Sequence, residues 1–272
     1  MALPSPSPGA TVIVTGASSG IGEQIARRLT DLGHGVTLVA RRGDRLEALA
    51  TELRRATGVT VGVEVCDLGD DAARWSLIGR ISEADVHVSG VVNNAGFGTY
   101  GRFDGLPFDR EQAMVRLNVL ALHELTGAFL WPMVEAGAGA ILNVASVAAF
   151  QPLPGFATYA ATKSFVQTFS ESLHAELAGT GVSVTTLSPG PVATEFGEVA
   201  GVGNIEDSAP GGAVPAGDVA AAAVRGMLHG KRSVVPGVAT KGMVLGGRLI
   251  PRTLLLPAAK RAAGVRLRNP QK

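Results

Sequence analysis

Short apolar runs alternate with longer amphipathic stretches along most of this 272-residue chain. The runs are rich in β-branched residues and are apolar throughout, whereas a strand with one exposed face would be apolar at every second position. Such runs are typical of parallel strands that are covered on both faces. We expect strands at 11–14, 36–39, 59–63, 86–92, 140–144 and 182–187.

The stretches between these runs have the character of helices. We expect helices at 21–32, 44–56, 72–81, 109–135, 156–178 and 218–228. Strands and helices in this alternation predict an α/β fold with a doubly wound parallel sheet of the Rossmann type. No linker divides the pattern, so we expect a single domain at 10–238 after a Pro- and Ser-rich, flexible lead-in at 1–9.

The composition is that of an ordinary soluble globular protein, with 46% hydrophobic residues and a formal net charge of +1. The single cysteine, Cys66, excludes an internal disulfide and fits a reducing compartment. No secretory signal opens the sequence, so a cytoplasmic location is expected. We predict no metal site and no nucleic-acid partner.

The first expected strand runs directly into T-G-A-S-S-G-I-G at 15–22. Gly16, Gly20 and Gly22 permit a tight turn that approaches a pyrophosphate closely, and the next helix turns its amino terminus toward the phosphates. The spacing is G-x-x-x-G-x-G rather than the G-x-G-x-x-G of many dinucleotide sites. Its place between a strand and a helix predicts a nucleotide site.

The second expected strand runs into Arg41 and Arg42, where many NAD sites carry a carboxylate for the ribose 2′-hydroxyl. The missing acid and the two guanidinium groups favour the 2′-phosphate of NADP(H) over NAD(H). Ser18 is a further candidate contact for that phosphate. The alternative is a solvated pair of loop residues.

Ser146, Tyr159 and Lys163 together indicate acid–base chemistry on a carbonyl or an alcohol. Ser146 follows the strand at 140–144, and Tyr159 and Lys163 lie four residues apart, hence on one face of their helix. A free tyrosine has a pKa near ~10, and an adjacent ammonium group lowers that pKa toward the range useful for proton transfer. A Tyr and a Lys at this spacing also occur by chance.

These residues together resemble the short-chain dehydrogenase/reductase family. The matching motifs are T-G-A-S-S-G-I-G at 15–22, N-N-A-G at 93–96, Asn118, Ser146, Y-A-A-T-K at 159–163 and P-G at 189–190. They follow the family's order and spacing over residues 10 to about 195. The resemblance implies a sheet of about seven strands, the last at 233–236, and a nicotinamide cofactor.

The resemblance also implies a catalytic tetrad of Asn118, Ser146, Tyr159 and Lys163. Tyr159 is then the general acid or base, Lys163 lowers its pKa and holds the nicotinamide ribose, and Ser146 polarises the carbonyl. Asn118 fixes a helix irregularity that carries a water-linked proton relay. The expected cofactor-binding residues are Gly16, Ser18, Ser19, Gly20, Ile21, Gly22, Arg41, Arg42, Asp67, Leu68, Asn94, Ala95, Gly96, Tyr159, Lys163, Pro189, Gly190, Val192 and Thr194. A substrate lid is expected at about 191–217.

The segment at 239–272 departs from the compact family pattern. After Asp218 the chain has no acid and eleven Lys or Arg, so residues 1–218 hold 13 bases against all 23 acids. Charge and proline interrupt its aliphatic residues too often for a membrane span. It can lie on an anionic membrane surface or near a phosphate-bearing substrate; the alternative is a helical cap on the sheet edge.

The resemblance therefore predicts an oxidoreductase that interconverts a ketone or aldehyde and an alcohol with NADP(H), in either direction. A lipophilic substrate, such as a 3-ketoacyl thioester or a steroid, is favoured by apolar side chains near the expected pocket, namely Phe97, Tyr100, Phe150, Leu153 and Phe156. The alternatives are a non-catalytic NADP-binding sensor or scaffold and, less favoured, a sugar-nucleotide epimerase. The resemblance also suggests a homodimer or homotetramer built on the helices at 109–135 and 156–178.

Overall fold

The computed structural model describes residues 3–202 and 212–264. It contains a seven-stranded parallel sheet with the strand order β3-β2-β1-β4-β5-β6-β7. The strands are β1 (Ala10–Thr15), β2 (Val36–Ala40), β3 (Val61–Val65), β4 (His87–Asn93), β5 (Gly139–Val144), β6 (Val182–Leu187) and β7 (Ser233–Val234). The order reverses between β1 and β4, and ligands bind at the carboxyl ends of strands beside such a switch. The predicted doubly wound sheet is confirmed.

The third strand begins at Val61, two residues later than expected. The preceding helix ends at Gly58, in a left-handed conformation (φ 72°), and the chain then needs two residues to reach the sheet. The Thr60 carbonyl accepts a hydrogen bond from the Val36 N–H (3.0 Å), and pairing to β2 starts there. The strand also contains Glu64, which interrupts the apolar run. A charged residue is tolerated because β3 is an edge strand and Glu64 forms an ion pair with an arginine of the next helix.

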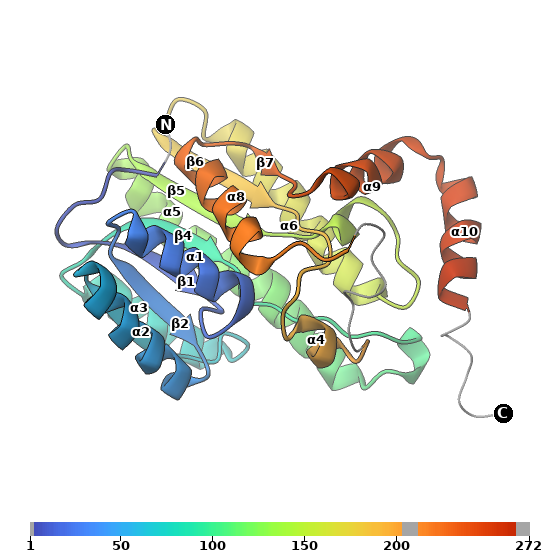
Figure 1. Cartoon of the computed structure of the whole chain (residues 1–272), viewed down its shortest axis with the longest axis horizontal. Helices are drawn as coiled ribbons and strands as arrows, with labels where there is room; N and C mark the ends of the chain where they lie inside the picture. The colour runs from blue at the N-terminus through green and yellow to red at the C-terminus, as the bar shows by residue number, and fades with distance from the viewer. Residues whose placement is uncertain (1–2, 203–211, 265–272) are drawn as a thin grey trace.

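Helices cover both faces of the sheet (Figure 1). On one face lie α1 (Gly20–Asp31), α2 (Gly43–Thr57) and α8 (Ala216–Leu228), and on the other α3 (Asp71–Glu83), α5 (Leu122–Glu135) and α6 (Ala157–Glu176). Two short helices, η1 (Phe103–Gly105) and α7 (Phe196–Ala200), lie in connections. Each face has its own apolar core. Leu3, in the expected lead-in, is buried in the first of them beside Met227.

The expected helix at 109–135 changes its geometry in the middle. α4 (Phe108–Val115) passes into a π-helical turn, η2 (Arg116–Ala121), and then into α5. By length and composition alone, this 28-residue helical segment is sufficient to cross a membrane. Its side chains at Leu125, Phe129 and Met133 are instead buried in the core against the sheet. We therefore interpret the segment as a core helix of the globular fold.

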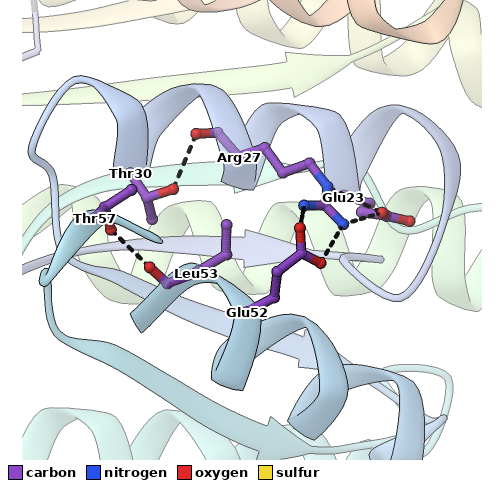
Figure 2. Close-up of polar contacts among 6 residues, drawn as sticks. All are labelled: Glu23, Arg27, Thr30, Glu52, Leu53 and Thr57. Atoms are coloured by element: carbon purple, nitrogen blue, oxygen red, sulfur yellow. Dashed lines mark hydrogen bonds and ion pairs between the residues drawn. The ribbon is translucent and has the colours of Figure 1, made fainter. Parts of the chain in front are cut away.

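An ion-paired arginine joins the first two helices (Figure 2). The Arg27 guanidinium on α1 contacts Glu23 of its own helix (2.9 Å) and Glu52 of α2 (2.6 Å). The pKa of Arg27 lies above its usual value, and the hydrogen bond to Glu52 contributes most to this shift. The contact holds α2 beside α1, and α1 carries the glycine loop at its amino terminus.

Two helices extend away from the sheet after β7 (Figure 1). They are α9 (Val238–Leu249) and α10 (Arg252–Gly264). α9 packs on η3 (Val147–Phe150), with Thr240 buried and Gly247 so close that an added Cβ would lie 3.0 Å from a backbone oxygen of η3. The exposed aliphatic side chains of this region are Val238, Leu245 and Leu249 on α9, Ile250 between the helices, and Leu254 and Leu256 on α10. β7 itself ends before Pro236, which has no N–H for the sheet ladder.

Candidate active site

Ser146, Tyr159 and Lys163 converge at the carboxyl end of β5. Ser146 is the N-cap residue directly before η3, and its Oγ accepts a hydrogen bond from the Ala148 N–H (3.1 Å). A side-chain hydrogen bond also links Ser146 to Tyr159. Lys163, one turn beyond Tyr159, donates to the Val144 carbonyl at 2.8 Å, and its Nζ lies 5.8 Å from the centre of the tyrosine ring. The three side chains face one reaction space.

Burial controls the protonation of this group. Desolvation raises the pKa of Tyr159 to about 12, against the opposing effect of its hydrogen bond with Ser146. Desolvation also lowers the pKa of Lys163 to about 8. The Lys163 ammonium group donates to the Val144 carbonyl, and its predicted lowering of the Tyr159 pKa stays a prediction. At neutral pH Tyr159 therefore keeps its proton.

Asn118 lies in the π-helical turn η2, so the expected helix irregularity is present. Its Oδ1 accepts a hydrogen bond from the Phe97 N–H (3.1 Å), and its Nδ2 donates to the Phe97 carbonyl (2.9 Å) and to Thr162 (3.1 Å). Thr162 in turn donates to the Tyr159 carbonyl at 2.7 Å. Asn118 thus connects the loop after β4 to the helix that carries Tyr159.

The glycine loop forms a tight cradle that fits a pyrophosphate. Gly16 and Gly20 have φ values of 64° and 58°, which only glycine adopts without strain. An added Cβ at Gly22 would lie 2.4 Å from the Gly16 carbonyl oxygen, so the α1 amino terminus and the loop are in contact. Asn94 fixes the loop to β4 by donating to the carbonyls of Thr15 (3.0 Å) and Gly16 (3.3 Å). Free N–H groups at a helix amino terminus favour a phosphate.

The two predicted arginines lie in different environments. Arg42 donates to Ser18 Oγ (2.9 and 3.0 Å) and to Ser19 Oγ (2.7 Å), and it forms an ion pair with Glu195 (2.8 Å). The Arg41 side chain is 76% exposed, and its closest acid is Asp67 at 4.0 Å. Arg42 is therefore preorganised beside the glycine loop, whereas Arg41 is free to reorient toward a ligand.

A sequence profile of short chain dehydrogenases matches residues 10–201 of the chain. The chain belongs to the short-chain dehydrogenase/reductase family. Sulfoacetaldehyde reductase 2 of Chromohalobacter salexigens is 41% identical over 187 residues, which are 68% of this chain and 73% of the relative. Serine 3-dehydrogenase of Rhizobium radiobacter is 36% identical over 201 residues, which are 73% and 78% of the two chains. The chain is accordingly an oxidoreductase of alcohols and carbonyl compounds.

Solved structures extend this likeness over nearly the whole chain. A short-chain dehydrogenase from Sphingobium yanoikuyae in complex with NADPH has a TM-score of 0.79 and 32% identity, covering 97% of this chain and 98% of that one. The bulky-bulky ketone specific alcohol dehydrogenase from Comamonas testosteroni has a TM-score of 0.74 and 28% identity, covering 96% of both chains. The shared fold thus extends past the segment that the family profile matches.

The other predicted cofactor residues lie along the crevice that a doubly wound fold forms outside the carboxyl ends of its strands. Asp67 accepts from the Gly69 N–H (2.9 Å), and Leu68 is buried beside it. The Ala95 N–H donates to Thr15 Oγ1 (3.0 Å). Thr194 lies over the glycine loop, as an added Cβ at Gly20 would be only 3.0 Å from the Thr194 methyl group.

The remaining positions along the crevice are Ile21 at the start of α1, Gly96 against Asn118, and Pro189, Gly190 and the buried Val192 after β6. Part of the expected lid at 191–217, namely 203–211, lies outside the described residues.

Sequence reasoning missed three residues that the structure brings to the site. Phe196 packs its ring on Tyr159, with 5.3 Å between the centroids. Glu195 forms ion pairs with Arg42 (2.8 Å) and with Arg45 (2.6 Å). Arg45 lies one turn of helix beyond Arg42, and that spacing was a signal available in the sequence. No local pattern marks Glu195 or Phe196.

The expected apolar pocket is only partly assembled around the tyrosine. Phe156 lies between Tyr100 (4.9 Å) and Tyr159 (5.9 Å), as ring-centroid distances show. Phe97 instead lies under the Arg110 guanidinium, 5.6 Å from it. Leu153 lines a hollow of about 400 Å³ that opens on a different face of α6 from the catalytic side chains. The aromatic group at Tyr159 thus consists of Tyr100, Phe156 and Phe196.

Proposed function

We propose that the protein reduces a lipophilic ketone or aldehyde to an alcohol, with Tyr159 as the proton donor. The observation that carries this proposal is that Tyr159, a partly buried residue, is hydrogen-bonded to Ser146 beside Lys163 and holds its proton at neutral pH. NADPH, when bound, supplies the hydride for the carbonyl carbon. Ser146 orients the carbonyl oxygen toward Tyr159, and Tyr159 donates its proton to that oxygen.

Lys163 and Asn118 support this proton transfer. Lys163 is buried and holds the end of β5 through the Val144 carbonyl, and it is the ammonium group nearest the Tyr159 ring among the described residues. Its positive charge stabilises the phenolate that forms when the proton leaves. Asn118 fixes the loop at Phe97, which borders the same space, and through Thr162 the backbone of Tyr159. These residues hold the donor in one orientation.

The proposed cofactor preference is NADP(H) over NAD(H). Arg42 with Ser18 and Ser19 forms a donor cluster at the end of β2, and Arg41 lies next to it in the sequence. Arginine recognises phosphate oxygens through paired N–H groups. The only acid that the described residues place in contact with this cluster, Glu195, comes from the opposite side of the crevice rather than from the end of β2. The related structure from Sphingobium yanoikuyae was solved with NADPH.

The proposed substrate is bulky and apolar. Tyr100, Phe156 and Phe196 form one aromatic group with Tyr159, and such a surface gains free energy by burying an apolar ligand. A structural relative is named as specific for ketones with two bulky groups. In contrast, the relative from Chromohalobacter salexigens is named for sulfoacetaldehyde, which is a small anionic carbonyl compound.

The test is the consumption of NADPH, followed by absorbance, against ketosteroids, 3-ketoacyl thioesters, quinones, aliphatic aldehydes and sulfoacetaldehyde. We expect turnover with bulky apolar ketones and a higher kcat/KM with NADPH than with NADH. Faster reduction of sulfoacetaldehyde than of every apolar carbonyl would contradict the substrate class. Cofactor binding without turnover on any compound would instead support the non-catalytic sensor.

We also propose a second copy of the chain as a partner. Trp131 on α5 is 68% exposed, and Phe165 on α6 is exposed beside Phe169 and His123. Exposed aromatic patches on a folded domain mark interaction sites. Sedimentation of the purified protein should show a dimer or tetramer, and Trp131→Glu should shift it toward the monomer. A monomeric wild-type protein would contradict this proposal.

The outer faces of α9 and α10 are proposed to contact an anionic membrane surface. The two helices carry exposed aliphatic side chains, such as Leu249 and Leu254, together with Lys and Arg and no acid, because no acid follows Asp218 in the sequence. Full-length protein should sediment with anionic but not zwitterionic vesicles, and less so as salt rises. Lys260→Glu with Arg261→Glu should abolish binding, whereas Arg55→Glu on α2 should not. If the wild-type protein binds no vesicles at any salt concentration, the membrane proposal is wrong, and α9 and α10 have a packing role alone.

A further inference from the structure

Glu195 connects the two sides of the cofactor crevice. It follows the segment after β6, yet its two carboxylate oxygens contact arginines that follow β2, Arg42 at 2.8 Å and Arg45 at 2.6 Å. Arg42 uses its other N–H groups on Ser18 and Ser19 of the glycine loop. The hydrogen-bonding capacity of Arg42 is therefore divided between the glycine loop and one carboxylate.

The neighbours of Glu195 extend along the same crevice. Thr194 lies against the glycine loop at Gly20, and Phe196 packs on the ring of Tyr159. The three consecutive residues therefore reach from the phosphate end of the site to the catalytic end. A change in the partners of Glu195 is expected to move Phe196 relative to Tyr159.

The carboxylate acts as an internal anion at a phosphate-binding site. Hydrogen bonds from Arg45 and Arg42 hold the pKa of Glu195 at about 2, so the group is ionised throughout the neutral range. Its ion pairs are partly exposed, with side-chain exposures of 38% for Arg42, 48% for Arg45 and 42% for Glu195. Ion pairs of this kind are weak enough to exchange for another anion.

We propose that Glu195 is a specificity-determining residue that competes with the 2′-phosphate of NADP(H) for Arg42 and Arg45. The inference rests on the proposed preference for NADP(H). A 2′-phosphate that binds beside Ser18 must take N–H groups that Glu195 now holds, and the two anions repel each other at close range. NAD(H) carries a neutral 2′-hydroxyl there and leaves the ion pairs in place. Glu195 thus weakens binding of the phosphorylated cofactor and leaves binding of the other unchanged.

The test measures binding rather than turnover. Adenosine 2′,5′-bisphosphate and 5′-AMP are titrated calorimetrically into the wild type, Glu195→Gln and Glu198→Gln. Glu195→Gln keeps the size of the side chain and removes its charge. Glu198→Gln is the matched control, because Glu198 is an exposed acid on the adjacent helix α7. We expect Glu195→Gln to bind the bisphosphate about three- to tenfold more tightly, the range that exchange of two weak ion pairs supports, with 5′-AMP unchanged. Glu198→Gln should match the wild type for both nucleotides.

Three results would overturn the inference. Equal tightening of the bisphosphate and 5′-AMP would show a general charge effect, and weaker binding of the bisphosphate would show that Glu195 positions Arg42 for the phosphate. A wild type that prefers the bisphosphate, with that preference unchanged in Glu195→Gln, would refute the competition alone. Equal binding of the two nucleotides by both the wild type and Glu195→Gln, a special case of the third result, would refute the NADP(H) preference as well. A melting curve for each variant verifies that it is folded.

Discussion

The two ends of the site control charge by opposite means. At the catalytic end, burial shifts the pKa values of Tyr159 and Lys163, upward for the phenol and downward for the ammonium group. At the phosphate end, Arg42 and Glu195 are partly exposed, and ion pairing lowers the pKa of Glu195. Desolvation is little affected by salt, whereas exposed ion pairs are screened. The catalytic end should therefore respond to pH, and the phosphate end to ionic strength and to the charge of the ligand.

Removal of the Tyr159 hydroxyl should have the largest effect. Tyr159→Phe keeps the ring that packs on Phe196 but removes the proton donor. We expect kcat to fall by a factor on the order of 100 or more, with NADPH affinity nearly unchanged. Stopped-flow reduction and a parallel NADPH titration separate the two quantities. A variant that kept more than about a tenth of kcat, a loss under about 1.4 kcal/mol of barrier, would remove Tyr159 from its assigned role.

The pH dependence should reveal the buried Lys163. Its pKa of about 8 predicts that kcat/KM for carbonyl reduction falls above that pH, by about tenfold per pH unit, as the ammonium group loses its proton. The stability effect has the opposite sign. Lys163 has a lower pKa in the folded state, so between that value and 10.5 the unfolded chain binds more protons and this group makes the free energy of unfolding rise with pH.

A rate profile and a thermal melt at each pH therefore separate catalysis from unfolding. We expect activity to decline above pH 8 in protein that still melts cooperatively. A kcat/KM that stays constant to pH 10 would contradict the combination of a pKa of about 8 and a need for the ammonium form of Lys163.

Arg41 tests the phosphate end with a smaller expected effect. Arg41→Ala should raise KM for NADPH by about tenfold, the equivalent of about 1.4 kcal/mol, and KM for NADH little, because only the 2′-phosphate needs the guanidinium. High salt should reduce the difference between wild type and variant. The measurement is KM for both cofactors at low and high ionic strength. Equal effects on the two cofactors would assign Arg41 to the solvated loop.

The sequence predicts most of the catalytic end because its signals are local. The glycine loop, Ser146 and the Tyr159–Lys163 spacing each lie within one strand-to-helix connection or one helix. Their mutual approach follows from the parallel sheet, which brings the carboxyl ends of β1, β4 and β5 to one edge. The raised pKa of Tyr159 was not foreseen, since the depth of burial at this helix and the contact of Lys163 with the Val144 carbonyl are not visible in the sequence.

The phosphate end was less predictable because its contacts join distant segments. Glu195 and Arg42 are 153 residues apart, and no periodicity relates them. Phe196 reaches Tyr159 in the same way, from a segment rich in Gly and Pro where only a lid was expected. The last helix, α10, contains Pro257, and such a break within a helix obscures the pattern from which helices are predicted.

The smallest effect is expected at Arg27, whose partly exposed ion pairs are of the same kind as those at the phosphate end but involve no ligand. It joins α1 and α2 behind the glycine loop through Glu23 and Glu52 (Figure 2). The pKa of Arg27 is raised in the folded state, so Arg27 stays charged over the working pH range, and the stabilising effect is limited in acid by Glu52, whose pKa Arg27 lowers. We expect Arg27→Leu to lower Tm by only about 2 °C at low salt and less at high salt, because partly exposed pairs contribute little.

The stability contribution of the pair should also disappear in the wild type as the pH falls below the unfolded pKa of glutamate and Glu52 is protonated. A large, salt-independent loss of Tm would show that Arg27 acts through packing between the helices. Salt-screened ion pairing would then be a property of the phosphate end and not of α1 and α2 beside the glycine loop.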